Sequence, residues 1–173
     1  MRLFIAINFP DAVKDRLESA VQALRRQGVK ASWSRRENLH LTLEFLGEVE
    51  RAAPVIAAME RVRAWKFCLR LTDSGRFRRE GGDIFWLGVD RSESLMGLQA
   101  ELHQSLRREG LRLEKRPYRP HLTLARRLRD RGETVLAQPV PEAVPVRGIS
   151  LMRSDRVEGK VRYTELYWRE LED

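Results

Sequence analysis

His40-Leu41-Thr42-Leu43 and His121-Leu122-Thr123-Leu124 are two copies of one tetrapeptide in a chain of 173 residues that has three histidines. Successive side chains of a β-strand point to opposite faces, so each His shares a face with the Thr two residues later. The two Leu of each copy point to the other face, where they can pack in a core. Each copy therefore predicts a strand with a polar His–Thr pair on one side and an apolar anchor on the other.

The similarity between the two copies extends upstream. Leu24-Arg25-Arg26-Gln27-Gly28 precedes the first copy, and Leu106-Arg107-Arg108-Glu109-Gly110 precedes the second. Each half therefore has the same order: a helix end, a glycine stop, a basic connector and a His-x-Thr strand. We interpret the chain as a duplicated, pseudo-symmetric unit whose two motif strands face one central cleft.

The pattern of apolar residues predicts an α+β fold. Helical spacing predicts three helices, which are Asp11–Gln27, a segment from near Pro54 through Val62, and Ser94–Glu109. Apolar runs and alternation predict seven strands, which are Leu3–Phe9, Leu39–Leu46, Phe67–Leu71, Ile84–Val89, Pro120–Arg127, Val146–Met152 and Val161–Trp168.

Two segments are predicted as loops: the basic stretch Ser74–Gly82, and the stretch that holds Pro139, Pro141 and Pro145. Neither is long or flexible enough to link two domains. The mixed order of strands and helices therefore predicts a single α+β domain over residues 1–173.

The composition is that of a basic globular protein. Lys and Arg number 33 against 25 Asp and Glu, which gives a net charge of +8. Guanidinium groups bind phosphate oxygens in a bidentate fork, so this excess gives weak support for phosphate-bearing partners. Cys68 is the only cysteine, so an intrachain disulfide and a Cys-based zinc site are excluded. The apolar run Leu3–Phe9 is too short for a signal peptide or a membrane span, and we expect a cytoplasmic protein.

His40 and His121 are the candidate catalytic residues, because histidine can give or take a proton near neutral pH. Two histidines on opposite sides of a phosphorus can divide the work, one as base for water and one as acid for the leaving oxygen. Thr42 and Thr123 can then hydrogen-bond the non-bridging phosphate oxygens. Arg126 can add positive charge, but five positions from His121 place it on the opposite face of a regular strand, so it needs a bulge to reach the phosphate.

Other chemistries fit the sequence less well. A zinc site needs three or four ligands, and no His, Asp or Glu cluster has suitable spacing. The motifs supply only Glu44 as a nearby carboxylate, and the chain has no P-loop and no nucleophile elbow. His103, on the third predicted helix, is interpreted as a structural or surface residue.

A basic rim around the cleft is a further hypothesis. Arginines and lysines of the connectors and of the basic loop can form it, with aromatic residues among them that can stack on bases. The simpler interpretation is solvated loops with buried aromatic side chains. The residues concerned are Arg35, Arg36, Lys115, Arg116, Arg119, Arg76 to Arg79, Trp33, Phe77 and Tyr118.

The chain resembles the 2H phosphoesterase superfamily, and within it the RNA 2',3'-cyclic phosphodiesterases, also called 2'-5' RNA ligases. The resemblance is carried by Trp33, by Asn38-Leu39-His40-Leu41-Thr42-Leu43-Glu44-Phe45-Leu46-Gly47-Glu48 and by Tyr118-Arg119-Pro120-His121-Leu122-Thr123-Leu124-Ala125-Arg126. It implies a bilobal fold with two antiparallel sheets flanked by helices, in which each lobe brings one motif to the cleft. One departure is Glu44, where such proteins often have a basic or neutral polar residue; strand parity places it on the His40 face.

The resemblance also implies an activity: hydrolysis of an RNA or nucleoside 2',3'-cyclic phosphate to a 2'-phosphomonoester, without metal or cofactor. His40 would be the proton donor to the leaving 3' oxygen and His121 the base for water, with Thr42, Thr123 and Arg126 on the phosphate. The implied partners are RNA ends or nucleotides that carry the cyclic phosphate, with no membrane and no protein partner, and we expect a monomer. The alternative is a factor that binds or ligates RNA ends and hydrolyses them only incidentally.

Overall fold

The computed structural model describes residues 1–136 and 143–173, and its helices and strands follow a mixed order. In chain order the elements are β1 (Arg2–Asn8), α1 (Asp11–Arg26), β2 (Ser32–Trp33), a 3₁₀ helix (Arg36–Asn38), β3 (His40–Glu48), α2 (Ala53–Arg61), β4 (Phe67–Leu69), β5 (Leu71–Phe77), β6 (Asp83–Val89), α3 (Glu93–Arg108), β7 (His121–Leu128), β8 (Val144–Val146), β9 (Gly148–Val157) and β10 (Lys160–Glu170).

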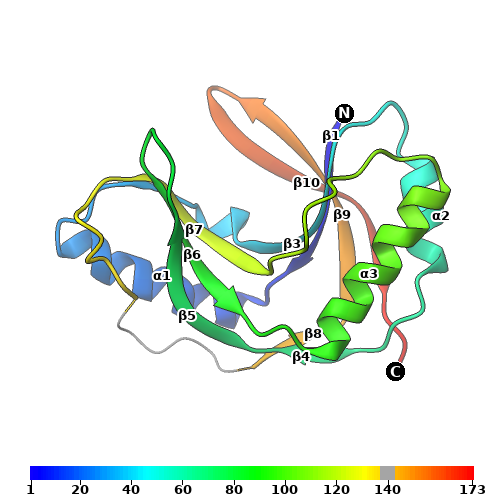
Figure 1. Ribbon diagram of the computed structural model, residues 1–173, viewed down its shortest axis with the longest axis horizontal. Helices are drawn as coiled ribbons and strands as arrows, with labels where there is room; N and C mark the ends of the chain where they lie inside the picture. Colours follow the sequence, from blue (N-terminus) through cyan, green and yellow to red (C-terminus); the bar gives the residue numbers. More distant parts are fainter. Residues whose placement is uncertain (137–142) are drawn as a thin grey trace.

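Two four-stranded antiparallel sheets form the framework. Sheet A has the order β10-β9-β1-β3, and sheet B has the order β2-β7-β6-β5. A small third sheet pairs β4 with β8. Each motif strand lies in a different sheet, and the tips of the β5–β6 and β9–β10 hairpins project on the same side of the molecule (Figure 1). The predicted α+β class, with two antiparallel sheets, is confirmed.

The helices form where their apolar stripes can be buried. In α1 the inward residues are Val13, Leu17, Ala20, Val21 and Leu24. Ser92 caps α3 by accepting a hydrogen bond from the Leu95 backbone N–H at 3.2 Å. The predicted stops Gly28 and Gly110 have φ of 89° and 84°, a left-handed conformation that glycine adopts without strain. The motif leucines anchor both strands in the core, because Leu41, Leu43, Leu122 and Leu124 are each at most 2% exposed.

The helices α2 and α3 pack on each other and on sheet A. Ser105 of α3 donates to the Ala58 carbonyl of α2 at 2.8 Å, and Arg169 of β10 donates to the Met59 carbonyl at 3.0 Å. In Figure 1, α1 lies on the side of the molecule that holds β5, β6 and β7. Within the described residues, no helix is long and apolar enough to cross a membrane.

Four predicted boundaries are wrong. One is the expected strand Val146–Met152, which runs from the end of β8 into β9, although these two strands belong to different sheets. The expected strand Phe67–Leu71 is two strands: β4 pairs with β8, and β5 pairs with β6 from Leu71 onward. The expected loop Ser74–Gly82 is strand as far as Phe77, because Gly75 lets the Trp86 ring of β6 lie against the backbone; a Cβ there would lie 2.3 Å from that ring. Val62 follows the end of α2 in an extended conformation.

The proline-rich loop is only partly described. Pro145, predicted in this loop, lies on the short strand β8 and pairs with Cys68 of β4. Proline is tolerated on a strand that has a neighbour on one side only. Pro139 and Pro141 lie outside the described residues.

Candidate active site

One large cleft, about 1340 Å³ in volume, contains all five site residues expected from the sequence. His40 and Thr42 reach it from β3, and His121, Thr123 and Arg126 reach it from β7. Residues of the β5–β6 and β9–β10 hairpins, among them Arg79 and Arg156, line its walls. The two motif strands of the internal repeat thus contribute to a common space.

A backbone carbonyl orients each motif imidazole. The Nδ1 of His40 lies 2.7 Å from the Asn38 oxygen, and the Nδ1 of His121 lies 2.6 Å from the Arg119 oxygen. A carbonyl only accepts, so each Nδ1 carries the proton and donates it. In the neutral ring Nε2 then has a free lone pair, and that of His40 accepts from the Thr42 hydroxyl at 2.9 Å. Both rings therefore have the tautomer that a base acting through Nε2 requires.

Aromatic rings surround both histidines. The centroids of Phe4 and Tyr163 lie 4.9 Å and 5.3 Å from that of His40. Those of Phe77 and Trp86 lie 4.9 Å and 6.5 Å from that of His121. Burial lowers the pKa of His40 to about 4, and it also lowers the pKa of His121. The free protein at neutral pH therefore holds two neutral imidazoles.

A β-bulge follows each His-Leu-Thr triplet. In sheet A, Ala6 pairs with Thr42 and Ile5 with Glu44, which leaves Leu43 as an extra residue. In sheet B, Trp86 pairs with Thr123 and Phe85 with Ala125, which leaves Leu124 as the extra residue. An extra residue reverses the alternation of faces beyond it. The bulges therefore show that the repeat extends past the tetrapeptide.

The bulge in β7 returns Arg126 to the His121 face. In a regular strand, a residue five positions after His121 points to the opposite face. The extra residue Leu124 shifts the alternation by one, so Arg126 points to the same face as His121. Arg126 lines the cleft and, as a nearby positive charge, contributes to lowering the pKa of both histidines. The bulge that the sequence analysis required for Arg126 to reach the His121 face is therefore present.

The bulge in β3 overturns the placement of Glu44 on the His40 face. Glu44 pairs with the fully buried Ile5, and its carboxylate accepts hydrogen bonds from Gln99 at 2.9 Å and from His103 Nδ1 at 2.5 Å. Burial raises the pKa of Glu44. His103, interpreted from sequence as a structural or surface residue, thus ties α3 to β3 at one end of the cleft.

Phe45 takes the place on the His40 face that parity assigned to Glu44. It pairs with Phe4, is 41% exposed and lines the cleft, with the Arg2 guanidinium 4.9 Å from the centre of its ring. Phe45 was not among the sequence candidates, since only the bulge turns it toward the site.

Each half also holds the motif strand of the other half. The Tyr118 hydroxyl, upstream of β7, donates to the Thr42 carbonyl of β3 at 2.8 Å. The Ser34 hydroxyl, upstream of β3, donates to the Thr123 carbonyl of β7 at 3.0 Å. We call these two contacts the cross-brace. It connects the carbonyls of the two motif threonines to the opposite connectors and so joins the two sides of the site.

The predicted basic rim is only partly present. Among its expected members, those that line the cleft are Trp33, Arg35, Phe77, Arg79, Arg116, Tyr118 and Arg119. Arg76 does not, because it is 13% exposed and its guanidinium binds Asp130 at 2.6 Å and Asp83 at 3.1 Å. Arg36 pairs instead with three carboxylates of α1. Arg156 is a rim residue that the sequence did not indicate, since its hairpin is placed by sheet pairing.

Within residues 1–136 and 143–173, no three His, Cys, Asp or Glu side chains are grouped as metal ligands would be. The groups that the cleft offers to a phosphate are the imidazoles, hydroxyls and guanidinium groups already described.

Comparison with known proteins places this chain in a family. A family model described as the 2'-5' RNA ligase superfamily matches residues 10–158. An RNA 2',3'-cyclic phosphodiesterase of Thermotoga maritima is 38% identical over 131 residues, which are 73% of this chain and 70% of that protein. The protein of the same name from Escherichia coli is 33% identical over 174 residues, 95% of this chain and 93% of that protein.

Solved structures agree with the sequence relatives. E. coli LigT complexed with 3'-AMP matches with a TM-score of 0.80 at 29% identity, covering 98% of this chain and 96% of that one. A protein of Thermus thermophilus matches with a TM-score of 0.78 at 29% identity, covering 99% and 98%. Two His-x-Thr strands facing one cleft, and a family match over most of the sequence, lead to one assignment: the chain belongs to the 2'-5' RNA ligase superfamily of 2H phosphoesterases.

Proposed function

We propose that this protein is an RNA 2',3'-cyclic phosphodiesterase, which opens the cyclic phosphate at an RNA end or on a nucleotide to a 2'-phosphomonoester. The observation that carries the proposal is the pair of imidazoles, one from each motif strand, each held by a backbone carbonyl at Nδ1 and lining the same cleft. The relatives from T. maritima and E. coli bear the name of this activity.

In the proposed mechanism His121 accepts a proton from water through Nε2 as the water oxygen bonds to phosphorus. The bond between phosphorus and the 3' oxygen breaks, and His40 donates a proton to that oxygen. The 2' oxygen keeps the phosphate. The direction of transfer follows the family resemblance, since the near-symmetry of the site offers Nε2 atoms on both sides. His40 must first gain a proton, which a bound phosphodiester anion favours by raising its pKa.

Thr42, Thr123 and Arg126 are assigned to the phosphate. The threonine hydroxyls donate to the non-bridging oxygens, and the Arg126 guanidinium stabilises the charge that builds up on them during in-line displacement. Thr42 donates to His40 Nε2 in the free protein, so a substrate that takes this hydroxyl also releases Nε2 for protonation. We further propose that the chain acts as a single-domain monomer in the cytoplasm, a compartment in which cysteines such as the free Cys68 stay reduced.

Incubation with a nucleoside 2',3'-cyclic phosphate in EDTA tests the proposal. The expected product is the 2'-phosphomonoester, formed with a bell-shaped pH dependence of kcat/KM. We expect His40→Ala and His121→Ala each to lower kcat by roughly 100- to 10,000-fold, the range attributed to general acid–base groups.

The unfolding midpoint of each variant, measured in parallel, should match that of the wild-type protein, so that the lower kcat is not caused by unfolding. A 3'-phosphate product, or full activity in both histidine variants, would contradict the proposal. Tight RNA binding that survives in the double histidine variant, without turnover, would favour the RNA-end-binding alternative.

A further inference from the structure

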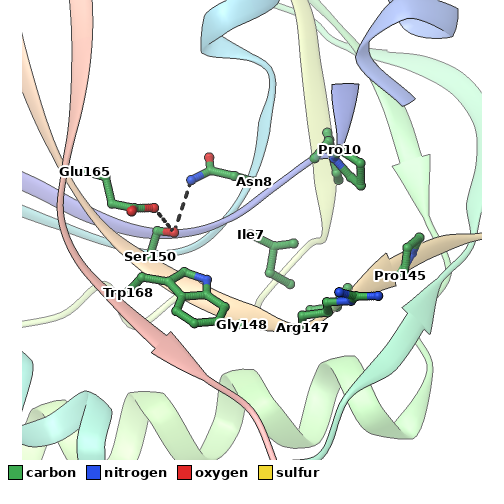
Figure 2. Close-up of a pocket in the computed structure, with 11 residues that line it drawn as sticks. Ile7, Asn8, Pro10, Pro145, Arg147, Gly148, Ser150, Glu165 and Trp168 are labelled. Carbon is green, nitrogen blue, oxygen red and sulfur yellow. Dashed lines mark hydrogen bonds between the residues drawn. The ribbon is translucent and has the colours of Figure 1, made fainter. Parts of the chain in front are cut away.

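A second concavity, about 470 Å³ in volume, is lined by residues of β1, β9 and β10 and of the segments next to them (Figure 2). On β10, Tyr163 lines the cleft, whereas Glu165 and Trp168 line the second concavity. On β1, Asn8 lines the concavity and is the direct strand partner of His40. We call this concavity the Trp168 pocket.

The face of sheet A is continuous from the cleft into the Trp168 pocket. Tyr163, Glu165 and Trp168 pair with Ser154, Met152 and Ser150 of β9, which are spaced by two and therefore share a face. The bulge between Glu165 and Tyr167 is what keeps Trp168 on that face. Glu165 follows Tyr163, whose ring packs on His40, by two residues, and two strand residues span about 7 Å. The pocket therefore begins about that far from Tyr163.

The Trp168 pocket has a flat aromatic wall and an apolar base. Trp168 is 46% exposed, and its indole lies against the backbone at Gly148, where a Cβ would be only 2.5 Å from the ring. Ile7, Pro10 and Pro145 contribute the apolar surface. An exposed indole held flat in a concavity is suited to stacking on a planar ring.

Polar groups border this wall on two sides. The Ser150 hydroxyl donates to Glu165 Oε2 at 2.7 Å and accepts from the Asn8 side-chain amide at 3.1 Å, which fixes the carboxylate at the edge of the pocket (Figure 2). Arg147 lies on the other side of the pocket from Asn8. A fixed carboxylate accepts hydrogen bonds from base N–H groups, and a guanidinium binds phosphate.

We propose that the Trp168 pocket binds the base of the nucleotide that precedes the cyclic-phosphate nucleotide, so the preferred substrate is an RNA end of two or more nucleotides. The base stacks on Trp168 with its N–H edge toward Glu165, while Arg147 faces the backbone phosphate. The pocket has this role only if the proposed function holds, because the cyclic phosphate in the catalytic cleft sets where the chain enters.

The experiment compares kcat/KM on two substrates, uridine 2',3'-cyclic phosphate and the dinucleotide GpU that ends in a 2',3'-cyclic phosphate. The wild-type protein should prefer the dinucleotide. Trp168→Ala should lower kcat/KM on the dinucleotide roughly tenfold, the loss of one base–aromatic stack, and leave the mononucleotide unaffected. The mononucleotide activity thus reports on folding within the same variant. Trp65→Ala is the matched control, since Trp65 is a 60% exposed tryptophan outside both cavities and should change neither rate.

Equal kcat/KM on both substrates in the wild type, or an equal loss on both in Trp168→Ala, would overturn the pocket assignment and leave the proposed function intact. If the wild type hydrolyses neither substrate, the proposed function fails. Calorimetric titration with the GpU dinucleotide bearing a 2'-phosphate measures the contribution of the pocket apart from turnover. The assignment requires weaker binding by Trp168→Ala than by Trp65→Ala, and equal binding by the two variants would overturn it.

Discussion

At the scale of single residues, the environment of His40 links the protonation of its ring to the stability of the fold. Phe4 and Tyr163 enclose the ring, and burial lowers its folded-state pKa from 6.5 to about 4. Between these two values the unfolded chain binds a proton that the folded chain does not, so the free energy of unfolding decreases as the pH falls from about 6.5 toward 4. Above pH 6.5 the ring is neutral in both states, and the stability that the neutral His40 allows is fully present. Its size is on the order of 3 kcal/mol.

Urea unfolding at pH 7 and pH 4.5 measures this effect. We expect His40→Gln, which cannot take up the proton, to lose less stability over this interval than the wild-type protein. The comparison removes the contribution of carboxylates that titrate in the same range, because both proteins share them. The same pH dependence in the two proteins would show that His40 is not held neutral by burial.

At the scale of secondary-structure elements, the cross-brace sets the positions of the two motif strands. Tyr118→Phe removes only the hydroxyl that donates to the Thr42 carbonyl, while the ring can stay in place. We expect kcat on a cyclic mononucleotide to fall on the order of tenfold with KM within about twofold, because small misplacements of catalytic groups affect the reaction more than binding. The cost in stability should be about 1 kcal/mol, the net value of one hydrogen bond.

Ser34→Ala makes the matched change on the other strand, where the hydroxyl donates to the Thr123 carbonyl. It should reproduce the same split between kcat and KM. Loss of stability without loss of kcat in both variants, assayed well below their unfolding midpoints, would reduce the cross-brace to a purely structural contact.

The elements also show what the sequence could and could not predict. The motif strands and their His–Thr faces were predictable, because strand periodicity is local and the buried leucines obey it. The bulges were not, since one extra residue leaves no mark in the apolar pattern, and parity therefore failed for both Glu44 and Arg126. Arg76 was expected at the rim, but its partner Asp130 lies 54 positions away and only the folded chain joins them.

At the scale of the whole molecule, the fold gathers positive charge around the cleft from distant parts of the chain. The arginines that line it come from both sheets, both projecting hairpins and both connectors, and they outnumber the carboxylates Glu44, Glu114 and Asp155. The arginines are Arg2, Arg35, Arg79, Arg116, Arg119, Arg126 and Arg156. The lining of the cleft therefore has an excess of positive charge, as a surface that attracts phosphate groups would.

This distribution predicts that salt weakens the binding of long substrates more than that of short ones. For an oligoribonucleotide with a 2',3'-cyclic end, the slope of log KM against log salt concentration should be about 0.7 for each phosphate that the protein neutralises. For a cyclic mononucleotide the slope should be close to zero. Arg156→Ala, at the β9–β10 hairpin, should reduce the slope by one such increment, whereas Arg25→Ala, on the exposed surface of α1, should leave it unchanged. Equal slopes for the two substrates would mean that the arginines serve the reacting phosphate alone. A slope that is steep for the oligonucleotide but unchanged in Arg156→Ala would show that the RNA does not bind along this hairpin.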